Sequence, residues 1–345
     1  MKIYIRFFGI AFTFLLFSTP IQAQQNTLQI GQYLLNSLID EYQSLGNGIY
    51  INALLNHTYY RSDQELSEAQ KTEGRHLFDS MTFTVTEYYN GSLFFQEITG
   101  TDTLIPPTGD MSNRFSRFRN DKTCITPQFT IFYSSDGNRA LIENTQEFNP
   151  IVHHKGTTLL RFLYCIQSRN PDFLLSAVQS DNFNVLLESI SDNQTKLSII
   201  PKLNANTAQR YELIFSQINN KQVLRSCTIK NGDAVSWEKM LTYDDSAKVQ
   251  ECNVVEYIAS SNNGSITIRK FRETSIQINN LEFTNENNYS IDGLFNDLQD
   301  GTQIEDRIHA VVYKKGHPET LETMAEIERR TREAIENGTI LSPQD

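Results

Sequence analysis

The sequence has few of the residues that mark nucleic-acid-binding or zinc-binding proteins. Lysine and arginine number 30 against 41 aspartates and glutamates, which gives a formal net charge of -11. The chain therefore lacks the basic excess that nucleic-acid binding normally requires, and we expect no nucleic-acid partner. There are only 4 cysteines among 345 residues, and their spacing fits no zinc-binding pattern.

The sequence also lacks the motifs of several enzyme classes. It contains no Gly-x-Ser-x-Gly elbow, no His-Glu-x-x-His helix, no phosphate-cradling glycine loop and no dinucleotide fingerprint. The acidic residues between Asp292 and Asp306 do not follow the spacing of a calcium loop. We therefore expect a protein that is not an enzyme and that uses no metal or other cofactor. A glycosidase needs only two carboxylates facing a cleft and is the enzymatic alternative that stays open.

Long apolar runs are scarce, and the clearest one lies at the amino terminus. Lys2 and Arg6 precede the apolar run Phe7–Phe17, which is followed by Ile21-Gln22-Ala23. This run is shorter than the ~20 residues that cross a bilayer, and its flanks are those of a secretory signal peptide. We predict that residues 1–23 are removed after Ala23. The mature protein should be soluble, without a membrane span, and periplasmic or secreted.

What the sequence does contain is a succession of β-strands. The runs are rich in Val, Ile, Tyr, Phe, Trp and Thr, which suit a half-buried pleated surface. They are Gln209–Gln217, Gln222–Ile229, Ala234–Tyr243, Val249–Ala259 and Ser265–Ile278. The connections between them are short, so the strands must be antiparallel neighbours in a meander. Two connections, Asn219-Asn220 and Asn231-Gly232, have the residues that tight hairpin turns require.

Alternation along these strands predicts one buried and one exposed face. Tyr211, Leu213 and Phe215 share a face of the first strand, and Trp237 shares a face with Lys239 in the third. Earlier runs continue the pattern, with hairpins predicted at Asn90-Gly91 and Asp136-Gly137.

Helices are predicted at the start, middle and end of this succession. Apolar residues recur at helical spacing from Leu28 to Leu45, and two short helices are expected over Thr157–Gln167 and Pro171–Gln179. A last strand is expected over Ile308–Tyr313. The segment 317–345 is predicted to be a carboxyl-terminal helix and tail, with Pro318 in its first turn, after one β domain over residues 24–316.

The four cysteines are Cys124, Cys165, Cys227 and Cys252. An exported environment would allow disulfides among them. Cys227 and Cys252 lie on the second and fourth strands of the meander, about 10 Å apart and too far for a bridge. Their connectivity and the alternative of buried free thiols both stay open.

A basic and aromatic cluster contrasts with the acidic chain. It contains Arg114, Arg117 and Arg119, interleaved with Phe115 and Phe118. Arginine forms forked bonds with phosphate and carboxylate, so these arginines are candidates for contact with an anionic partner. The alternative is a solvated loop that its phenylalanines anchor to the core.

The order of elements resembles the outer-membrane lipoprotein carrier (LolA-like) superfamily. The resemblance rests on the signal peptide, the first helix, the antiparallel succession with inserted helices, and the closing Gly301-Thr302-x-Ile304-x-Asp306. It implies an α+β, mainly antiparallel fold, with an unclosed, curved β-barrel or half-barrel wrapped around the inserted helices. It also implies a cavity that holds acyl chains.

The sequence thus supports two hypotheses for function. The first is an exported monomer that binds a lipid, an acyl chain or a lipoprotein in the concavity of the sheet. The candidate cavity residues are Phe83, Val85, Tyr211, Leu213, Phe215, Trp237 and Ile268. The second is a structural or adhesion protein with a fully packed sheet, or a glycosidase-like hydrolase.

Overall fold

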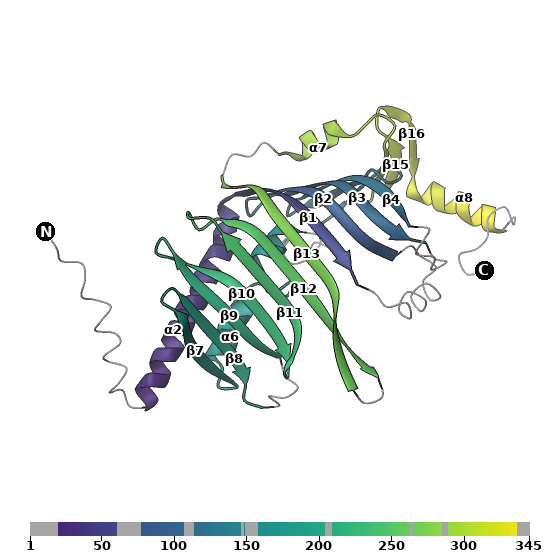
Figure 1. Cartoon of the computed structure of the whole chain (residues 1–345). Coiled ribbons are helices and arrows are strands. Elements are labelled where there is room, and N and C mark those ends of the chain that lie inside the picture. The colour runs from purple at the N-terminus through teal and green to yellow at the C-terminus, as the bar shows by residue number, and fades with distance from the viewer. Residues whose placement is uncertain are drawn as a thin grey trace. The chain divides into compact units, whose positions relative to one another are not determined.

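The alternating sequence folds into an α+β protein in which antiparallel strands predominate (Figure 1). The structure is a computed structural model, and it describes residues 20–60, 77–106, 114–145, 148, 158–203, 209–262, 265–284 and 289–336. The chain divides into two compact units, which are described separately. Unit 1 comprises Met1–Gln43 and Arg161–Glu273, and unit 2 comprises Ser44–Leu160 and Thr274–Asp345.

Unit 1 contains the predicted meander and the two strands that precede it. Its strands are β7 (Phe183–Ser191), β8 (Gln194–Pro201), β9 (Gln209–Ile218), β10 (Lys221–Asn231), β11 (Ala234–Tyr243), β12 (Val249–Asn262) and the first part of β13 (Ser265–Phe283). They are hydrogen-bonded in chain order from β7 to β13. The prediction of a mainly antiparallel, unclosed sheet with inserted helices is confirmed.

Helices cover one face of the sheet in unit 1. They are α2 (Pro20–Ser44), most of α5 (Leu159–Tyr164) and α6 (Asp172–Gln179). A Cβ atom on Gly31 of α2 would lie 3.3 Å from Leu197 of β8, and the ring of Phe173 in α6 lies 5.5 Å from that of Tyr211 in β9. Under the helices runs a buried cross-strand row of Leu197, Leu213, Cys227, Lys239 and Val254. The opposite face is the more exposed one, as the alternation predicted, and Leu186 and Met240 are exposed on it.

Of the two hairpin turns predicted in unit 1, one lies at the predicted residues and the other is shifted by one residue. Asn219 and Asn220 have φ angles of 47° and 66°, and they connect β9 to β10 as predicted. Asn231 instead pairs with Ala234, so the next turn consists of Gly232 and Asp233. Gly232 has a φ of 61°, which a residue without a Cβ adopts at little cost.

Unit 2 is built from the remaining strands. They are β1 (Ile49–Tyr59), β2 (Leu77–Tyr89), β3 (Phe94–Ile105), β4 (Phe115–Ile125), β5 (Phe129–Ser134), β6 (Arg139–Asn144), β14 (Gln303–Asp306), β15 (Val311–Lys314) and β16 (His317–Thr323). The order runs from the second part of β13 through β1–β6 and then β14–β16. β14 pairs with β6 in parallel, which departs from the antiparallel pattern. The short η1 (Leu45–Asn47) leads into β1, and α7 (Ile291–Asp297) packs Leu294 against Tyr88, Phe95 and Cys124.

Two predictions for unit 2 are wrong. The expected strand Ile308–Tyr313 begins only at Val311, as β15, because residues 307–310 form a turn after β14. The helix expected from residue 317 begins only at Met324, as α8 (Met324–Glu336), because His317–Thr323 pairs with β15 as strand β16. Pro318 therefore lies in the last strand of the order, a position that tolerates a missing N–H.

A buried carboxylate fixes the start of α5 within unit 2. Glu87 of β2 is fully buried and accepts hydrogen bonds from the backbone N–H groups of Leu159 and Leu160, at 2.7 and 3.0 Å. The side-chain amide of Gln96 donates to the same carboxylate at 2.6 Å. The first N–H groups of a helix have no partner within the helix, and a carboxylate there also favours the helix dipole.

Candidate functional site

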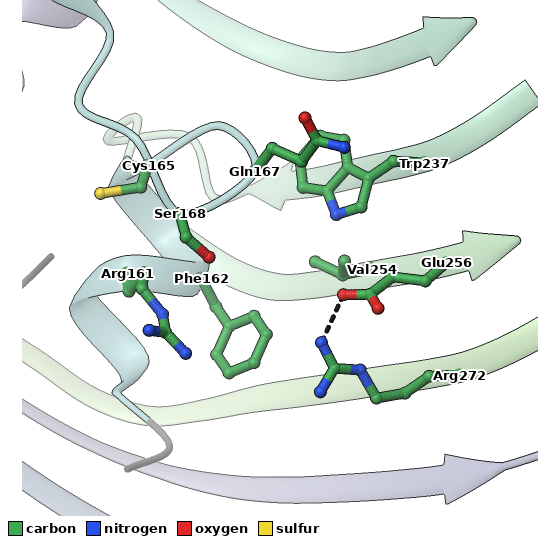
Figure 2. Close-up of a pocket in the computed structure, with 9 residues that line it drawn as sticks. All are labelled: Arg161, Phe162, Cys165, Gln167, Ser168, Trp237, Val254, Glu256 and Arg272. Carbon is green, nitrogen blue, oxygen red and sulfur yellow. Dashed lines mark hydrogen bonds and ion pairs between the residues drawn. The ribbon is translucent and has the colours of Figure 1, made fainter. Parts of the chain in front are cut away.

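Unit 1 contains a pocket between α5, the turn that follows it and strands β11–β13 (Figure 2). Its cavity volume is about 70 Å³. An engineered cavity of about 150 Å³ is large enough to bind benzene, so this pocket accommodates only a few heavy atoms as it stands. Its lining consists of Arg161, Phe162, Cys165, Gln167, Ser168, Trp237, Val254, Glu256 and Arg272.

One wall of the pocket is held by polar side chains that bind the carboxyl-terminal carbonyl groups of α5. The ammonium of Lys239 donates to the carbonyl oxygens of Leu163 at 2.5 Å and Cys165 at 3.1 Å. The thiol of Cys252 donates to the carbonyl oxygen of Phe162 at 3.6 Å. The last carbonyl groups of a helix have no partner within the helix, so these bonds supply what α5 itself cannot.

The turn after α5 forms the lip of the pocket and has an unusual backbone. Ile166 and Arg169 exchange two backbone hydrogen bonds of 2.9 Å, and the two residues between them are Gln167 and Ser168. These residues have φ angles of 49° and 66°. That region normally favours glycine or asparagine, and other residues there cost on the order of 1–3 kcal/mol. The turn thus places the amide of Gln167 and the exposed hydroxyl of Ser168 at the pocket, although the backbone of both residues has φ angles that residues with a Cβ disfavour.

The opposite wall combines an aromatic side chain with an ion pair. Trp237 of β11 is buried and lies directly across from Glu256 of β12. Glu256 is paired with the guanidinium of Arg272 on β13, and Figure 2 marks this pair with a dashed line. The two side chains are 27% and 29% exposed, so the ion pair lies where the pocket meets solvent. Aromatic surface and a few convergent polar groups are typical of small-molecule binding sites.

The thiols near the pocket are not activated for chemistry. Burial raises the pKa of Cys165 and Cys252 to about 11 each, although the nearby Lys239 ammonium acts in the opposite direction. Burial likewise raises the pKa of Cys227 and Cys124 to about 12. All four cysteines are buried free thiols, so the open question of their connectivity is answered. Within the part of the chain that the structure describes, no cluster of three or more metal-ligating side chains occurs.

The structure separates the seven predicted cavity residues. In unit 1, Trp237 lines the pocket, whereas Leu213 and Phe215 are fully buried and Tyr211 is 7% exposed. Ile268 on β13 is 41% exposed, so the alternation that was expected to bury it does not do so. The remaining two residues, Phe83 and Val85, are buried in β2 of unit 2.

The three predicted arginines all lie in unit 2 and have carboxylate partners. Arg114 pairs with Asp79 at 3.1 Å. Arg117 pairs with Asp102 at 2.9 Å and with Asp136 at 2.5 Å. Arg119 contacts Asp121 and lies 5.9 Å above the ring of Phe83.

The segment that holds Arg117 and Arg119 is a strand and not a loop, and Arg114 directly precedes it. It forms β4, in which Phe115 and Phe118 are 40% and 65% exposed and do not anchor the segment to the core. Asp102 of β3, Asp121 of β4 itself and Asp136 in the turn after β5 supply the carboxylates, which is why a basic run can form a strand in this acidic chain.

Most pocket residues were not predicted from the sequence. Trp237 was the one lining residue among the candidates, because α5, its turn, β12 and β13 meet only after folding. One signal was available: Lys239 interrupts an apolar strand face, and a lysine buried there needs acceptors from another element.

Comparisons with known proteins give distant likenesses only. No protein-family model matches the sequence, and no curated protein matches it. Among solved structures, a domain from Vibrio parahaemolyticus that is named for outer membrane lipoprotein sorting has a TM-score of 0.33 and 7% identity, over 75% of this chain and 95% of that one. An uncharacterized conserved protein from Thermus thermophilus has a TM-score of 0.28 and 11% identity, over 80% and 98%. A beta-barrel-like protein from Brucella abortus has a TM-score of 0.23 and 7% identity, over 69% and 98%.

The first of these structures is named for outer membrane lipoprotein sorting, as the sequence resemblance suggested, and its likeness to this chain is a distant one of fold. What the chain binds has to be argued from its own residues. Among the helices of the described residues, none is long and apolar enough to cross a membrane.

Proposed function

We propose that this chain is an exported, non-catalytic protein that binds an amphipathic ligand carrying an acyl chain, and that one end of the ligand enters the pocket of unit 1. The observation that carries the proposal is the incomplete packing between α5 and strands β11–β13, where Phe162, Trp237 and Val254 surround a cavity of about 70 Å³. Each methylene group that leaves water there contributes about 0.8 kcal/mol, which is roughly a fourfold gain in affinity.

The cavity alone is smaller than the roughly 300–1,000 Å³ of sites that enclose a drug-sized ligand. A longer chain therefore has to move the wall formed by α5 and its turn. That wall is short, its turn is strained at Gln167 and Ser168, and it is held through the carbonyl bonds of Lys239 and Cys252. The strain in the turn favours displacement of this wall, whereas the hydrogen bonds of Lys239 and Cys252 oppose it, so the ligand's binding energy has to offset their loss.

Fluorescence of the only tryptophan, Trp237, tests the proposal directly. Titration with hexanoate, octanoate, decanoate and dodecanoate should change its emission, with affinity rising along the series. Val254→Phe, which fills the cavity, should weaken binding at least tenfold. Leu186→Phe places the same side chain at an exposed position on β7 and should leave binding unchanged. Unchanged Trp237 emission and no heat of binding for any acid would contradict the proposal.

A packed structural or adhesion protein is the second candidate. The full burial of Leu197, Leu213 and Phe215 under the helices favours it, because these side chains need no ligand to cover them. This candidate predicts that filling the cavity with Val254→Phe stabilises the protein or leaves it unchanged, and that no amphiphile binds.

A further inference from the structure

The charged side chains of the pocket differ in sign from the chain as a whole. Arg161 and Arg272 line it together with a single carboxylate, that of Glu256. The ammonium of Lys239 lies behind the same wall, bonded to the carbonyl oxygen of Cys165. Two guanidinium groups and one carboxylate therefore line the pocket, in a chain with a formal net charge of -11. A cleft with an excess of one sign and low-dielectric walls concentrates its field on ligands of the opposite sign.

Two positively charged side chains act electrostatically on Cys165, which lines the pocket. Arg161 and Lys239 both act to lower the pKa of its thiol, although burial outweighs them. The aromatic and aliphatic lining lies next to this positive region, since Phe162 follows Arg161 in α5 and Val254 lies directly across from Lys239. The pocket thus offers positive charge and apolar surface within one small volume.

Glu256 already occupies the position of an anionic ligand. Its carboxylate accepts a hydrogen bond from a terminal nitrogen of Arg272, and it does so at the solvent-facing side of the pocket. Guanidinium groups bind carboxylate and phosphate through the same donors. An incoming carboxylate or phosphate would therefore compete with Glu256 for Arg272.

We infer that the pocket recognises the anionic headgroup of the amphiphile, a carboxylate or a phosphate, through Arg161 and Arg272, with Glu256 as the internal competitor that the headgroup displaces. This inference rests on the proposed function, and it adds the chemical class of the headgroup, which binds at the solvent-facing side of the pocket while the acyl chain enters the cavity. The amide of Gln167 and the hydroxyl of Ser168 at the lip supply further hydrogen bonds to the same headgroup.

The test compares ligands that share a ten-carbon chain and differ in the headgroup. Decanoate and decyl phosphate should bind at least tenfold more tightly than decanol, measured by calorimetry at one salt concentration, and higher salt should reduce this difference. Acetate and inorganic phosphate, which lack the chain, should bind at least a hundredfold more weakly than their long-chain counterparts.

Substitutions of the two members of the Glu256–Arg272 ion pair should change the affinity for decanoate in opposite directions. Arg272→Gln should weaken decanoate binding about tenfold and leave decanol unchanged. Glu256→Gln removes the competitor and should strengthen decanoate binding several-fold. If the ion pair only supported the structure, both substitutions would weaken the binding of both ligands. Arg210→Gln removes an arginine of the same unit that pairs with Asp233 at 2.9 Å, and it should change neither affinity.

The outcomes separate the inference from the proposed function. Equal binding of decanol and decanoate would overturn the headgroup inference and leave the acyl-binding function standing. Inorganic phosphate that binds as tightly as decyl phosphate would also overturn it, because the ligand would then be a free anion. If neither decanol nor decanoate binds, both the inference and the proposed function fail.

Discussion

The ammonium of Lys239 lies 2.5 Å from the carbonyl oxygen of Leu163, so a strand of the unit 1 sheet holds the end of α5 through a buried charge. The lysine also bonds to the carbonyl oxygen of Cys165, and Cys227 lies directly across from it on β10. A buried ammonium is stable only where it has acceptors, and here both acceptors belong to the wall of the pocket.

The first prediction concerns this lysine. Lys239→Met leaves the carbonyl groups of Leu163 and Cys165 without their donor. We expect the free energy of unfolding at pH 7 to fall by about 1–3 kcal/mol, the cost of unsatisfied buried polar groups. Chemical denaturation followed by circular dichroism measures it. The partly exposed pair of Lys270 with Glu273 offers a control, since Lys270→Met should cost less than about 1 kcal/mol. A Lys239→Met protein as stable as the wild type would contradict the role of these bonds.

The second prediction is a pH dependence with a defined sign. Burial lowers the pKa of Lys239, while Cys252, Cys165, Cys227 and Glu41 act to raise it. Because the folded protein holds this proton less tightly than the unfolded chain, Lys239 contributes more stability as pH rises from its folded pKa toward its ordinary value of about 10.5. The free energies of unfolding of the wild type and of Lys239→Met should therefore diverge between pH 7 and 10, with that of the wild type rising relative to that of the variant. Parallel pH profiles of the two proteins would contradict this.

The third prediction concerns Gly100 in β3. A Cβ atom there would lie 2.2 Å from the backbone oxygen of Thr82 and 2.8 Å from the Cα atom of Phe83. Gly100→Ala should therefore cost at least about 2 kcal/mol, because the two strands would have to separate. Gly46→Ala is the matched control, since nothing lies within 4 Å of the added atom. Thermal unfolding of both variants compares them, and equal stability would show that the β2–β3 contact is looser than described.

The fourth prediction separates stability from binding at the pocket lip. Gln167→Asn combined with Ser168→Gly gives the turn the residues that its positive φ angles favour. The protein should become more stable by about 1 kcal/mol, and decanoate binding should weaken because the amide is withdrawn and the hydroxyl is lost. Asn219→Asp with Asn220→Gly makes a comparable change at the β9–β10 turn and should leave binding unaffected. A loss of stability in the first variant would mean that the turn is not strained.

The sequence predicts the strands of this fold better than the site, for a physical reason. Alternation over Tyr211, Leu213 and Phe215 is a local property, and it identifies both β9 and its buried face. The burial of Lys239 could likewise be seen from its place on an apolar face, although its acceptors could not.

Features that depend on a neighbouring element were not predictable in the same way. Pro318 suits a helix start, but pairing with β15 makes this segment a strand. Ile268 follows an alternating pattern yet is exposed, because burial depends on what covers the strand at that point. The pocket combines residues of α5, its turn and three strands, and no spacing in the sequence brings Arg161 and Arg272 together.

The central claim, that an anionic amphiphile binds between α5 and strands β11–β13, is tested most directly by photocrosslinking. A ten-carbon fatty acid with a diazirine near its carboxylate would be bound to the protein, irradiated, and its crosslinks mapped by mass spectrometry. We expect labels on residues 161–168 and at Trp237, Val254 or Glu256, and we expect excess decanoate and Val254→Phe to reduce them. Labelling spread evenly over the surface, or confined to residues outside these segments, would contradict it.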